Sequence, residues 1–550
     1  MRSPAKIRHD TAKAKRGPLR TETRWFMDVE SSLNAILSSV VGSYARRIVE
    51  LDDRNARCVL TVCAFMKRSG KISGVERHRW LDGLLGAGVR TEGDLHSWMR
   101  EFFPDLSVRL WGTCRKQADK FLGAGVKVFG WSAPPSQSIA LSCPSVLFGK
   151  GRLNFDLPSF AVFNSRKPRL ISPDSDWLQA LRFFFRSLGL RGIALAGSAG
   201  TLTHDLVGTH ALRSGLAQFL VVPFPLLRAD SELFKTYGKG ANGTPVLSCM
   251  LDSFCCPQSQ PPVCRDRVLG MLADLHLILE IRSCGNLSAA LEEIQAKSPR
   301  PQLIHEPGEP GLSSGGNRGL IKKFPEFAHR FRPPRCADSP VKGRGDAEKI
   351  HFPLSDDIAW DDYLYHYTRG CAGPWPGEAY REYLLDLFDG GPLSGHSALE
   401  TLIRILQEGL IRAGSRMIRG AAGVISWSSH PPRELFVMRK WNRALVRWTV
   451  EPYGVAVRRD ILRSFGAKPA VYGSDRVYSR LAEPERHRFQ LSRAAGAASW
   501  RHEREWRILG DLALNAIIPD GGFVFVRTGE EKEKLCNNVN QDMSIVVLDA

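Results

Sequence analysis

The middle of this sequence carries arginines and glycines of the kind that bind phosphate. A guanidinium group is a planar fork that matches the oxygens of a phosphate, and a glycine lets a phosphate approach the backbone closely. The alternative for each arginine is an ordinary surface or helix-capping role, and for each glycine a simple turn of the chain. We expect the following residues to form a phosphate-binding or DNA-binding edge: Arg166, Lys167, Gly197, Gly200, Arg265, Arg267, Gly285, Gly316 and Arg318.

The elements that must position these residues are short strands alternating with helices. Between Ser159 and Pro307 the apolar runs SFAVF, GIALAG, QFLVVPF, LHLILEI and PQLIHE are separated by amphipathic stretches such as DWLQALRFFFRSL. Continuous apolar strands flanked by helices are typical of a parallel sheet buried on both faces. We therefore predict a doubly wound, Rossmann-like α/β domain over residues 136–330, with ligands beyond the carboxyl ends of its strands. The aromatic cluster Phe183–Phe185 has helical spacing and is expected in the core.

The rest of the chain divides into four further segments. Residues 1–28 are basic and lack an apolar stretch, which indicates a disordered arm and not a secretory signal. Apolar residues recur at helical spacing over 29–135, which predicts a helical domain. Residues 331–357 are rich in Pro, Arg and Gly and indicate a linker. One amphipathic helix, HSALETLIRILQEGLIRAG, followed by short strand-like runs predicts an α+β domain over 358–550.

The composition and charge narrow the class of partner. Of the 550 residues 76 are Lys or Arg and 57 are Asp or Glu, a formal net charge of +19, which favours polyanions, nucleic acid before membrane. The longest apolar runs are too short to span a bilayer. The 12 cysteines show no paired CxxC, so we expect reduced thiols in a cytoplasmic protein. Metal is not expected, because the densest cluster lacks the short chelating loop of a zinc site; its members are Cys249, Cys255, Cys256 and Cys264.

Five motifs between about residues 90 and 325 occur in the order of one known family. They are SCPSVLFGKG at Ser142–Gly151, AVFNSR at Ala161–Arg166, GIALAGSAGTLTHDLVGTHAL at Gly192–Leu212, RDRVLGMLADLHLILEIRSCGNLSAAL at Arg265–Leu291, and EPG with GGNRGLI near Gly315. This run resembles the DNA-processing protein A (DprA, or Smf) family. The resemblance implies a Rossmann-like fold that binds single-stranded DNA, often as a homodimer, and delivers it to a RecA-like recombinase.

The sequence departs from this family at two places. Asn164 stands where the family has the first glycine of its GSR motif, and the segment after the second strand lacks the family's Asp in register. Both departures fall in the expected pocket, so whether that pocket binds a nucleotide is left open.

The C-terminal domain carries a second set of short motifs. YLYHYTRG, SALETLIRILQEGLIRAG, VISWSS, PAVYGS and WRHEREWRI follow one another after Asp362. Together they resemble ADP-ribosyltransferase-like domains of bacterial toxins and phage-resistance proteins. The resemblance implies NAD as the substrate or cofactor and assigns catalytic roles to His366, Tyr367, Ser426 and Glu505, while Tyr365 or Tyr367 would cover the nicotinamide ring.

The chemistry of NAD cleavage needs a carboxylate. Breaking the bond between nicotinamide and ribose builds positive charge on the sugar, which a carboxylate bound to a ribose hydroxyl stabilises. Glu503 is the rival of Glu505, but Trp506 is expected to pack into the core on the face opposite Glu505, which favours Glu505. The alternative is that Glu503, Arg504, Glu505 and Arg507 form a solvated, salt-bridged face and that His366 is a structural residue.

Three hypotheses of function follow. The first is a defence protein against phage or foreign DNA, in which a DprA-like domain binds single-stranded DNA and the C-terminal domain acts as an NAD-consuming effector. The second is a non-enzymatic DNA-processing protein that loads a recombinase on incoming single strands, with the C-terminal domain as a partner module. The third is a Rossmann-like sensor of a small nucleotide.

Overall fold

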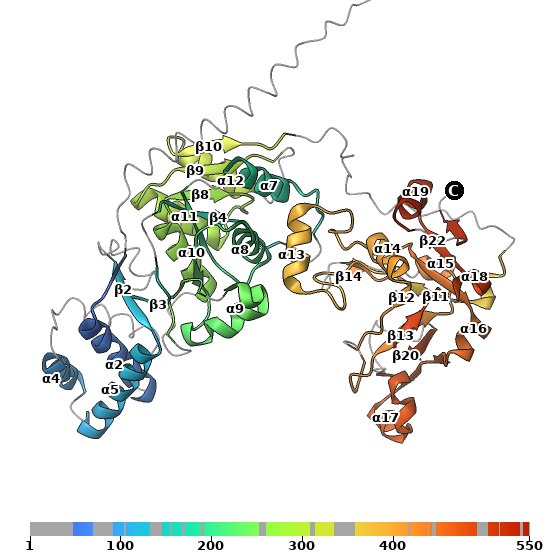
Figure 1. Cartoon of the computed structure of the whole chain (residues 1–550), viewed down its shortest axis with the longest axis horizontal. Coiled ribbons are helices and arrows are strands. Elements are labelled where there is room, and N and C mark those ends of the chain that lie inside the picture. The colour runs from blue at the N-terminus through green and yellow to red at the C-terminus, as the bar shows by residue number, and fades with distance from the viewer. Residues whose placement is uncertain are drawn as a thin grey trace, which may run out of the picture. The chain divides into compact units, whose positions relative to one another are not determined.

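A computed structural model shows two compact units (Figure 1). The first, the N-terminal unit, takes in Met1–Ser165, Asp176–Lys235 and Lys239–Asp338, and the second, the C-terminal unit, takes in Ser339–Ala550 with the short segments Arg166–Ser175 and Thr236–Gly238. The residues that the structure describes are 48–69, 92–103, 106–131, 146–153, 157–167, 171–188, 192–241, 243–251, 260–307, 314–334, 358–415, 418–437, 439, 441–442, 447–491, 504–515, 517–539 and 543–548. The predicted basic arm and most of the predicted linker lie outside these residues. None of the described helices is long and apolar enough to cross a membrane.

The N-terminal unit is built on one ten-stranded sheet, of which seven neighbouring strands are parallel. In sheet order these are β7 (Val246–Ser248), β6 (Gln218–Val222), β5 (Ala194–Gly197), β4 (Ser159–Phe163), β8 (Leu275–Ile278), β9 (Gln302–His305) and β10 (Ala328–Phe331). The five predicted strands correspond to β4, β5, β6, β8 and β9. The α/β class with a Rossmann-like parallel sheet is therefore confirmed.

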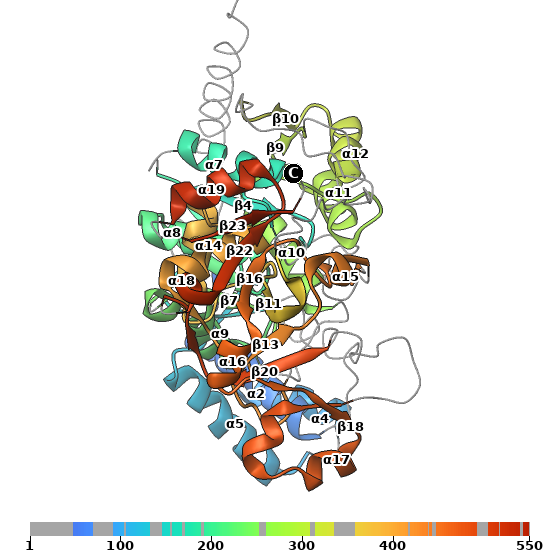
Figure 2. The ribbon, with the colours of Figure 1, turned by 90° about the vertical axis from the view of Figure 1, so that its right-hand side faces the viewer.

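Helices cover both faces of this sheet. The chain runs from β4 outward to β7, returns to the other side of β4 at β8, and continues to β10. Because crossovers between parallel strands are right-handed, this reversal places α7 and α8 on one face and α10 and α11 on the other, as both views show (Figures 1 and 2). The helices are α7 (Asp176–Leu188), α8 (Leu202–Ser214), α9 (Ala229–Tyr237), α10 (Pro261–Leu272), α11 (Asn286–Lys297) and α12 (Gly315–Lys323).

The core of the sheet explains why these segments form strands. Every residue of β4, β5, β8 and β9 is buried, as the continuous apolar runs require of strands covered on both faces. Phe183 and Phe184 of α7 are buried as well, which confirms the core role expected for this aromatic cluster.

Three antiparallel strands extend the sheet beyond β7. They are β3 (Val146–Lys150), β2 (Lys127–Trp131) and β1 (Ile48–Glu50), in that order from β7. The helices α2 (Asp53–Ser69), α4 (Glu92–Phe102) and α5 (Val108–Gly123) lie between β1 and β2 in sequence. The described residues of the segment 29–135 are thus largely helical, as expected, but two strands among them join the large sheet.

The C-terminal unit contains a seven-stranded sheet that is antiparallel except for its last pair. In order its strands are β17 (Lys468–Pro469), β20 (Glu505–Leu509), β13 (Val424–Ser428), β11 (Tyr363–Tyr367), β16 (Gly454–Arg458), β22 (Gly522–Val526) and β23 (Ile545–Val547). Three two-stranded sheets accompany it: β12 (Leu410–Ile411) with β21 (Leu512–Ala513), β14 (Trp441–Asn442) with β15 (Arg447–Trp448), and β18 (Val471–Gly473) with β19 (Phe489–Leu491). The expected α+β architecture is confirmed.

One junction in the seven-stranded sheet is open. Strands β11 and β13 share a single register pair, Tyr365 with Ser428. On either side the strands are fully paired, with five pairs between β11 and β16 and five between β13 and β20. The sheet therefore separates next to His366.

Helices complete this unit. They are α13 (Tyr380–Asp389), α14 (Ala398–Glu408), α15 (Pro432–Val437), α16 (Arg459–Ser464), α17 (Asp475–Arg480), α18 (Ile518–Gly521) and α19 (Gly529–Asn538). The predicted amphipathic helix is α14, which begins with a capping box between Ser397 and Glu400 and ends at Gly409 in the left-handed conformation. Its apolar face packs into the main core, with Leu402 and Leu406 fully buried.

Candidate functional site

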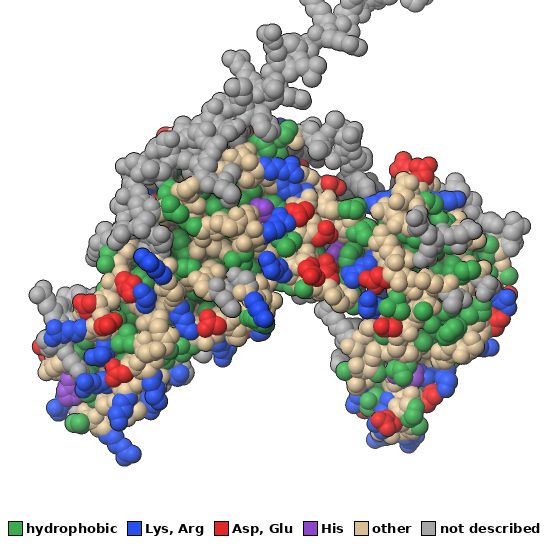
Figure 3. Space-filling view, viewed as in Figure 1, with side chains coloured by type: hydrophobic (Ala, Val, Ile, Leu, Met, Phe, Trp, Pro, Cys, Tyr) green, Lys and Arg blue, Asp and Glu red, His purple; other side chains and the backbone are tan. Residues whose placement is uncertain are grey.

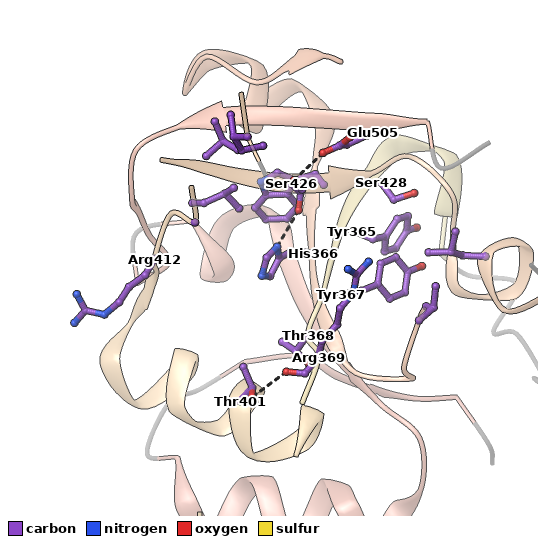
Figure 4. Close-up of a pocket in the computed structure, with 17 residues that line it drawn as sticks. Tyr365, His366, Tyr367, Thr368, Arg369, Thr401, Arg412, Ser426, Ser428 and Glu505 are labelled. Atoms are coloured by element: carbon purple, nitrogen blue, oxygen red, sulfur yellow. Dashed lines mark hydrogen bonds between the residues drawn. The ribbon is translucent and has the colours of Figure 1, made fainter. Parts of the chain in front are cut away.

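A cavity of about 380 Å³ lies in the C-terminal unit where β11 and β13 separate. Strands β11, β13 and β20 supply most of its wall, and α14 supplies Thr401 (Figure 4). All four predicted catalytic residues line it. The polar lining residues are Tyr365, His366, Tyr367, Thr368, Arg369, Thr401, Arg412, Ser426, Ser428 and Glu505.

Glu505 is held in one orientation by two neighbours. The Ser426 hydroxyl donates a hydrogen bond of 2.7 Å to Oε1 of Glu505. The Arg507 guanidinium donates to both carboxylate oxygens, from Nε to Oε1 at 2.9 Å and from Nη2 to Oε2 at 3.1 Å. Such a bidentate pair fixes the plane of the carboxylate as well as its distance. The carboxylate therefore lies at the cavity wall in a fixed orientation.

Arg507 is itself fixed by its surroundings. Its side chain is 2 % exposed, and Nη1 donates to the carbonyls of Phe489 at 2.7 Å and His487 at 3.1 Å. Residues two apart in a strand share a face, so β20 places Arg507 beside Glu505. Of the alternative, a solvated and salt-bridged face, the salt bridge is present for this pair, but the pair is largely buried and not solvated.

His366 meets the cavity from β11. Its Nδ1 lies 3.0 Å from the carbonyl oxygen of Ser426. Because a carbonyl only accepts, Nδ1 carries the proton, and Nε2 of the neutral ring is left as an acceptor. Burial lowers the pKa of the imidazole; the bond to Ser426 opposes this shift, and the nearby charge of Arg369 adds to it. The ring is thus neutral at ordinary pH.

The two tyrosines expected to cover the nicotinamide differ from each other. Tyr365 is fully buried, donates its hydroxyl hydrogen bond to the Trp360 carbonyl at 2.6 Å, and belongs to the second core cluster with Phe523 and Phe525. It is a core residue, so of the two expected residues Tyr367 fits that role better. Tyr367 is partly exposed and donates to the His430 carbonyl at 3.0 Å, so its ring is held at the cavity wall.

Glu503, the rival of Glu505, lies outside the described residues, so only the surroundings of Glu505 can be described. Trp506 packs against the main core, as predicted for the residue opposite Glu505. Sequence reasoning did not single out the lining residues Arg369 and Arg412, and it named Arg507 only in the alternative of a salt-bridged face. For Arg507 the available signal was the period-2 spacing that puts it on the face of Glu505. Arg369 lies beyond the end of β11, where that spacing assigns no face.

A second candidate site lies in the N-terminal unit, at the carboxyl ends of β4 and β8, where the order of the strands in the sheet reverses. The Ser165 N–H donates to the Glu280 carbonyl at 2.8 Å, and the Ser165 hydroxyl accepts from the Arg282 N–H at 3.0 Å. These contacts join the loops that follow the two strands. In doubly wound sheets ligands bind beyond the carboxyl ends of the strands at such a reversal of strand order.

The loop after β5 lies at the same end of the sheet. Gly200 has a φ of +89°, and its N–H donates to Oδ1 of Asp205 at 2.8 Å. Arg265 is buried, with Nη1 3.2 Å from the Ser198 hydroxyl and Nε paired with Asp266 at 2.7 Å. Burial, with the nearby charge of Arg265, lowers the pKa of His204 well below its usual value. Arg265 thus supports this loop from within.

The other predicted phosphate contacts have mixed surroundings. Arg267 is mostly buried and lies 3.4 Å from Glu293, whereas Arg318 is exposed on α12. A Cβ on Gly316 would lie 2.8–2.9 Å from Ile281 atoms and the Arg282 carbonyl, and a Cβ on Gly197 would lie 3.0 Å from Leu220, so both glycines allow close packing. Gly285 precedes α11 as its N-cap. Phosphate binding by this set stays a prediction.

Arg166 and Lys167 follow Ser165 directly; Arg166 is exposed and Lys167 is half-buried, and phosphate binding by both stays a prediction. In the space-filling view, Lys and Arg side chains are spread over the visible face and interspersed with Asp and Glu (Figure 3).

Among the described residues no group of three His, Cys, Asp or Glu is arranged to hold a metal ion. Cys249 and Cys264 are buried with their sulfur atoms 2.9 Å apart, while Cys255 and Cys256 lie outside the described residues.

Among the solved structures that are similar to this chain, two are of DNA processing protein A. No protein-family model matches the chain, and no curated protein matches it. DNA processing protein A from Streptococcus pneumoniae is similar with 16% identity over 50% of this chain and 90% of that one, at a TM-score of 0.30. DNA processing protein A from Helicobacter pylori, described for its single-stranded DNA binding mode, is similar with 19% identity over 34% of this chain and 82% of that one, at a TM-score of 0.27.

Proposed function

We propose that the C-terminal unit binds NAD in the cavity between β11 and β13 and cleaves the bond between nicotinamide and ribose. The observation that carries the proposal is the Glu505 carboxylate, which Ser426 and Arg507 hold at the cavity wall. The unit would then act as an ADP-ribosyltransferase or, with water as acceptor, as an NAD glycohydrolase.

The residues would divide the work as follows. Glu505 would accept a hydrogen bond from a ribose hydroxyl and stabilise the positive charge that develops on the sugar as nicotinamide leaves. Because Arg507 orients the carboxylate beforehand, little reorganisation is needed during the reaction. His366, fixed by the Ser426 carbonyl, would bind a ribose hydroxyl through Nε2, and Tyr367 would form a wall for the nicotinamide ring.

The test is release of nicotinamide from NAD by the full chain, with and without single-stranded DNA. We expect Glu505→Gln to lower the rate about 100-fold or more, because removing a preorganised charge at a reacting centre has effects of that size. Glu530→Gln, on the exposed first turn of α19, is the matched control and should leave the rate unchanged. Equal rates for wild type and Glu505→Gln, or no release by wild type under either condition, would reject the proposal.

For the N-terminal unit we infer binding of single-stranded DNA. The support is the ordered DprA-like motifs and the reversal of strand order between β4 and β8, close to which Arg282 is exposed. The net charge of +19 agrees with a polyanionic partner. DNA bound here would be the trigger or the acceptor for the C-terminal unit, in keeping with defence against phage or foreign DNA.

The alternative remains a non-enzymatic DNA-processing protein, a homodimer that loads a RecA-like recombinase, with the C-terminal unit as a partner module. Tight, salt-sensitive oligonucleotide binding without any NAD turnover would favour it. Binding of a mononucleotide that competes with the oligonucleotide would favour the small-nucleotide sensor, for which the Gly200 loop is the natural site.

A further inference from the structure

Arg369 is a cation inside the cavity that the proposed chemistry does not use. It lies two residues after Tyr367, and Figure 4 shows its guanidinium beside the Tyr367 ring, directed into the cavity. Its Nε is buried and has no hydrogen-bond partner among the described residues. The Thr401 hydroxyl donates to the Arg369 carbonyl at 3.1 Å and so ties this part of the backbone to α14.

The charges around the cavity leave Arg369 uncompensated. Arg412 lines the cavity too, but its Nε pairs with Glu408 at 2.9 Å. Glu505 is paired with Arg507. Within the part of the chain that the structure describes, Arg369 has no carboxylate partner, and its charge contributes to the lowered pKa of His366. The cavity therefore favours an anionic group near Arg369.

A buried guanidinium donor without a partner is costly, and an anion that accepts from it removes that cost. A phosphate suits it best, since its oxygens match the fork of the guanidinium. We propose that Arg369 is the phosphate-binding residue of this cavity, and that the ligand is a phosphate ester or pyrophosphate whose sugar reaches Glu505. This rests on the proposed function for the identity of the sugar, but not for the anion site itself.

The first measurement is calorimetric titration of the full chain with inorganic pyrophosphate. We expect Arg369→Gln to weaken binding about tenfold or more. Arg412→Gln is the matched control, because it removes a lining cation that is already paired, and should change the affinity little. The thermal unfolding midpoint of each variant shows whether it is folded.

The second measurement compares NAD with nicotinamide riboside, which has the same scissile bond and no phosphate. Arg369→Gln should raise KM for NAD about tenfold and leave KM for the riboside unchanged. Arg369→Lys should restore part of the loss, because an ammonium keeps the charge without the fork.

The outcomes separate this proposal from the function on which it rests. Pyrophosphate binding that depends on Arg369, with no NAD turnover by any form, would support the anion site and reject the NAD-cleaving function. NAD turnover with the same KM in wild type and Arg369→Gln would overturn the anion site. Failure of folded wild type to bind pyrophosphate, or equal binding by Arg369→Gln, would overturn it as well.

Discussion

The side chain of Arg507 determines the orientation of the Glu505 carboxylate in the candidate site. It lies almost fully out of water and gives its donors to Glu505 and to the carbonyls of His487 and Phe489. Charged groups at such depth are stable only when paired and hydrogen-bonded. Arg507 thus fixes the carboxylate and joins β20 to β19 and to the residues just before it.

Replacing Arg507 by Met should therefore lower both the stability of the C-terminal unit and its rate of nicotinamide release. Glu505 would keep its low exposure without a cation, which lowers the unfolding free energy of the C-terminal unit by about 3–5 kcal/mol. Nicotinamide release should fall in the fraction that remains folded. Arg507→Lys keeps the charge and should lie between wild type and Arg507→Met in urea unfolding. A Met variant as stable as wild type would contradict the role given to the pair.

For single residues, the sequence indicated which residues belong to the site but not which groups their side chains bond. His366, Tyr367, Ser426 and Glu505 were assigned by likeness to a family pattern, and the structure brings them around one cavity. Arg369 was missed, and Arg507 was assigned only to a solvated face, because an arginine in a sequence is usually a surface residue. Their burial depends on strands that pair far apart along the chain, and no local pattern reports such pairing.

The segment before α14 contains a buried histidine with a left-handed backbone conformation. His396 is fully buried, has a φ of +48°, and stacks on Trp375 with ring centroids 3.5 Å apart. Its Nδ1 lies 2.7 Å from the Gly373 carbonyl, and its Nε2 lies 3.7 Å from Glu378. Burial lowers the pKa of His396 to about 4, an effect that Arg404 strengthens and the bond to Gly373 opposes.

This histidine should make the C-terminal unit sensitive to acid. The unfolded imidazole binds a proton at its ordinary pKa of about 6.5, whereas the folded one stays neutral down to about 4. Stability is therefore full above pH 6.5 and is lost as the pH falls toward 4, by on the order of 2–3 kcal/mol. Burial raises the pKa of Glu378, which acts in the opposite direction. Urea unfolding between pH 7 and pH 4.5 should show a smaller loss for His396→Gln than for wild type, and an equal loss would refute the assignment.

In the N-terminal unit, helix α12 depends on a glycine at its start. The Gly316 N–H donates to the Ile281 carbonyl at 2.8 Å, and the adjacent Asn317 bonds the Leu279 and His305 carbonyls at 2.7 and 2.8 Å. These hydrogen bonds hold the first turn of α12 against the carboxyl ends of β8 and β9. A methyl group at Gly316 has no room there.

Gly316→Ala should lower the unfolding free energy of the N-terminal unit by about 1–3 kcal/mol, because backbone carbonyls cannot yield as a side chain can. Gly319→Ala in the same helix is the matched control, since its nearest neighbour would be Glu292 at 3.9 Å. It should leave stability unchanged or raise it by about 0.5–1 kcal/mol. Thermal unfolding compares the two, and equal effects would contradict the packing argument.

Element prediction succeeded where strands are buried on both faces and failed where they are short or polar. β4, β5, β6, β8 and β9 were predicted from continuous apolar runs. β7 has only three residues, and β10 reads AHRF with two exposed side chains, so neither gives a strand pattern. β1 and β2 were placed in a helical domain because their pairing into the large sheet is a long-range event.

For the whole molecule, the charge of +19 has a measurable consequence. Binding of a single-stranded oligonucleotide should weaken with salt, and each phosphate contact adds about 0.7 to the slope of log affinity against log salt. Arg318→Gln should reduce that slope by about 0.7. Lys323→Gln, on the same helix but paired with Glu292, should leave it nearly unchanged. Filter binding at several salt concentrations tests this, and identical slopes for both variants and wild type would remove Arg318 from the interface.

The open junction between β11 and β13 also divides the C-terminal sheet into two blocks, and the amide hydrogens inside each block are better protected from exchange than those facing the junction. Amide hydrogens inside each block, β17–β20–β13 and β11–β16–β22–β23, are bonded to neighbouring strands, whereas those facing the gap have a single register pair to protect them. Deuterium should therefore enter along the facing edges of β11 and β13 first. A ligand that fills the gap would bridge the two blocks, so slowed deuterium uptake at these two strands would report occupancy even for a molecule that is never turned over.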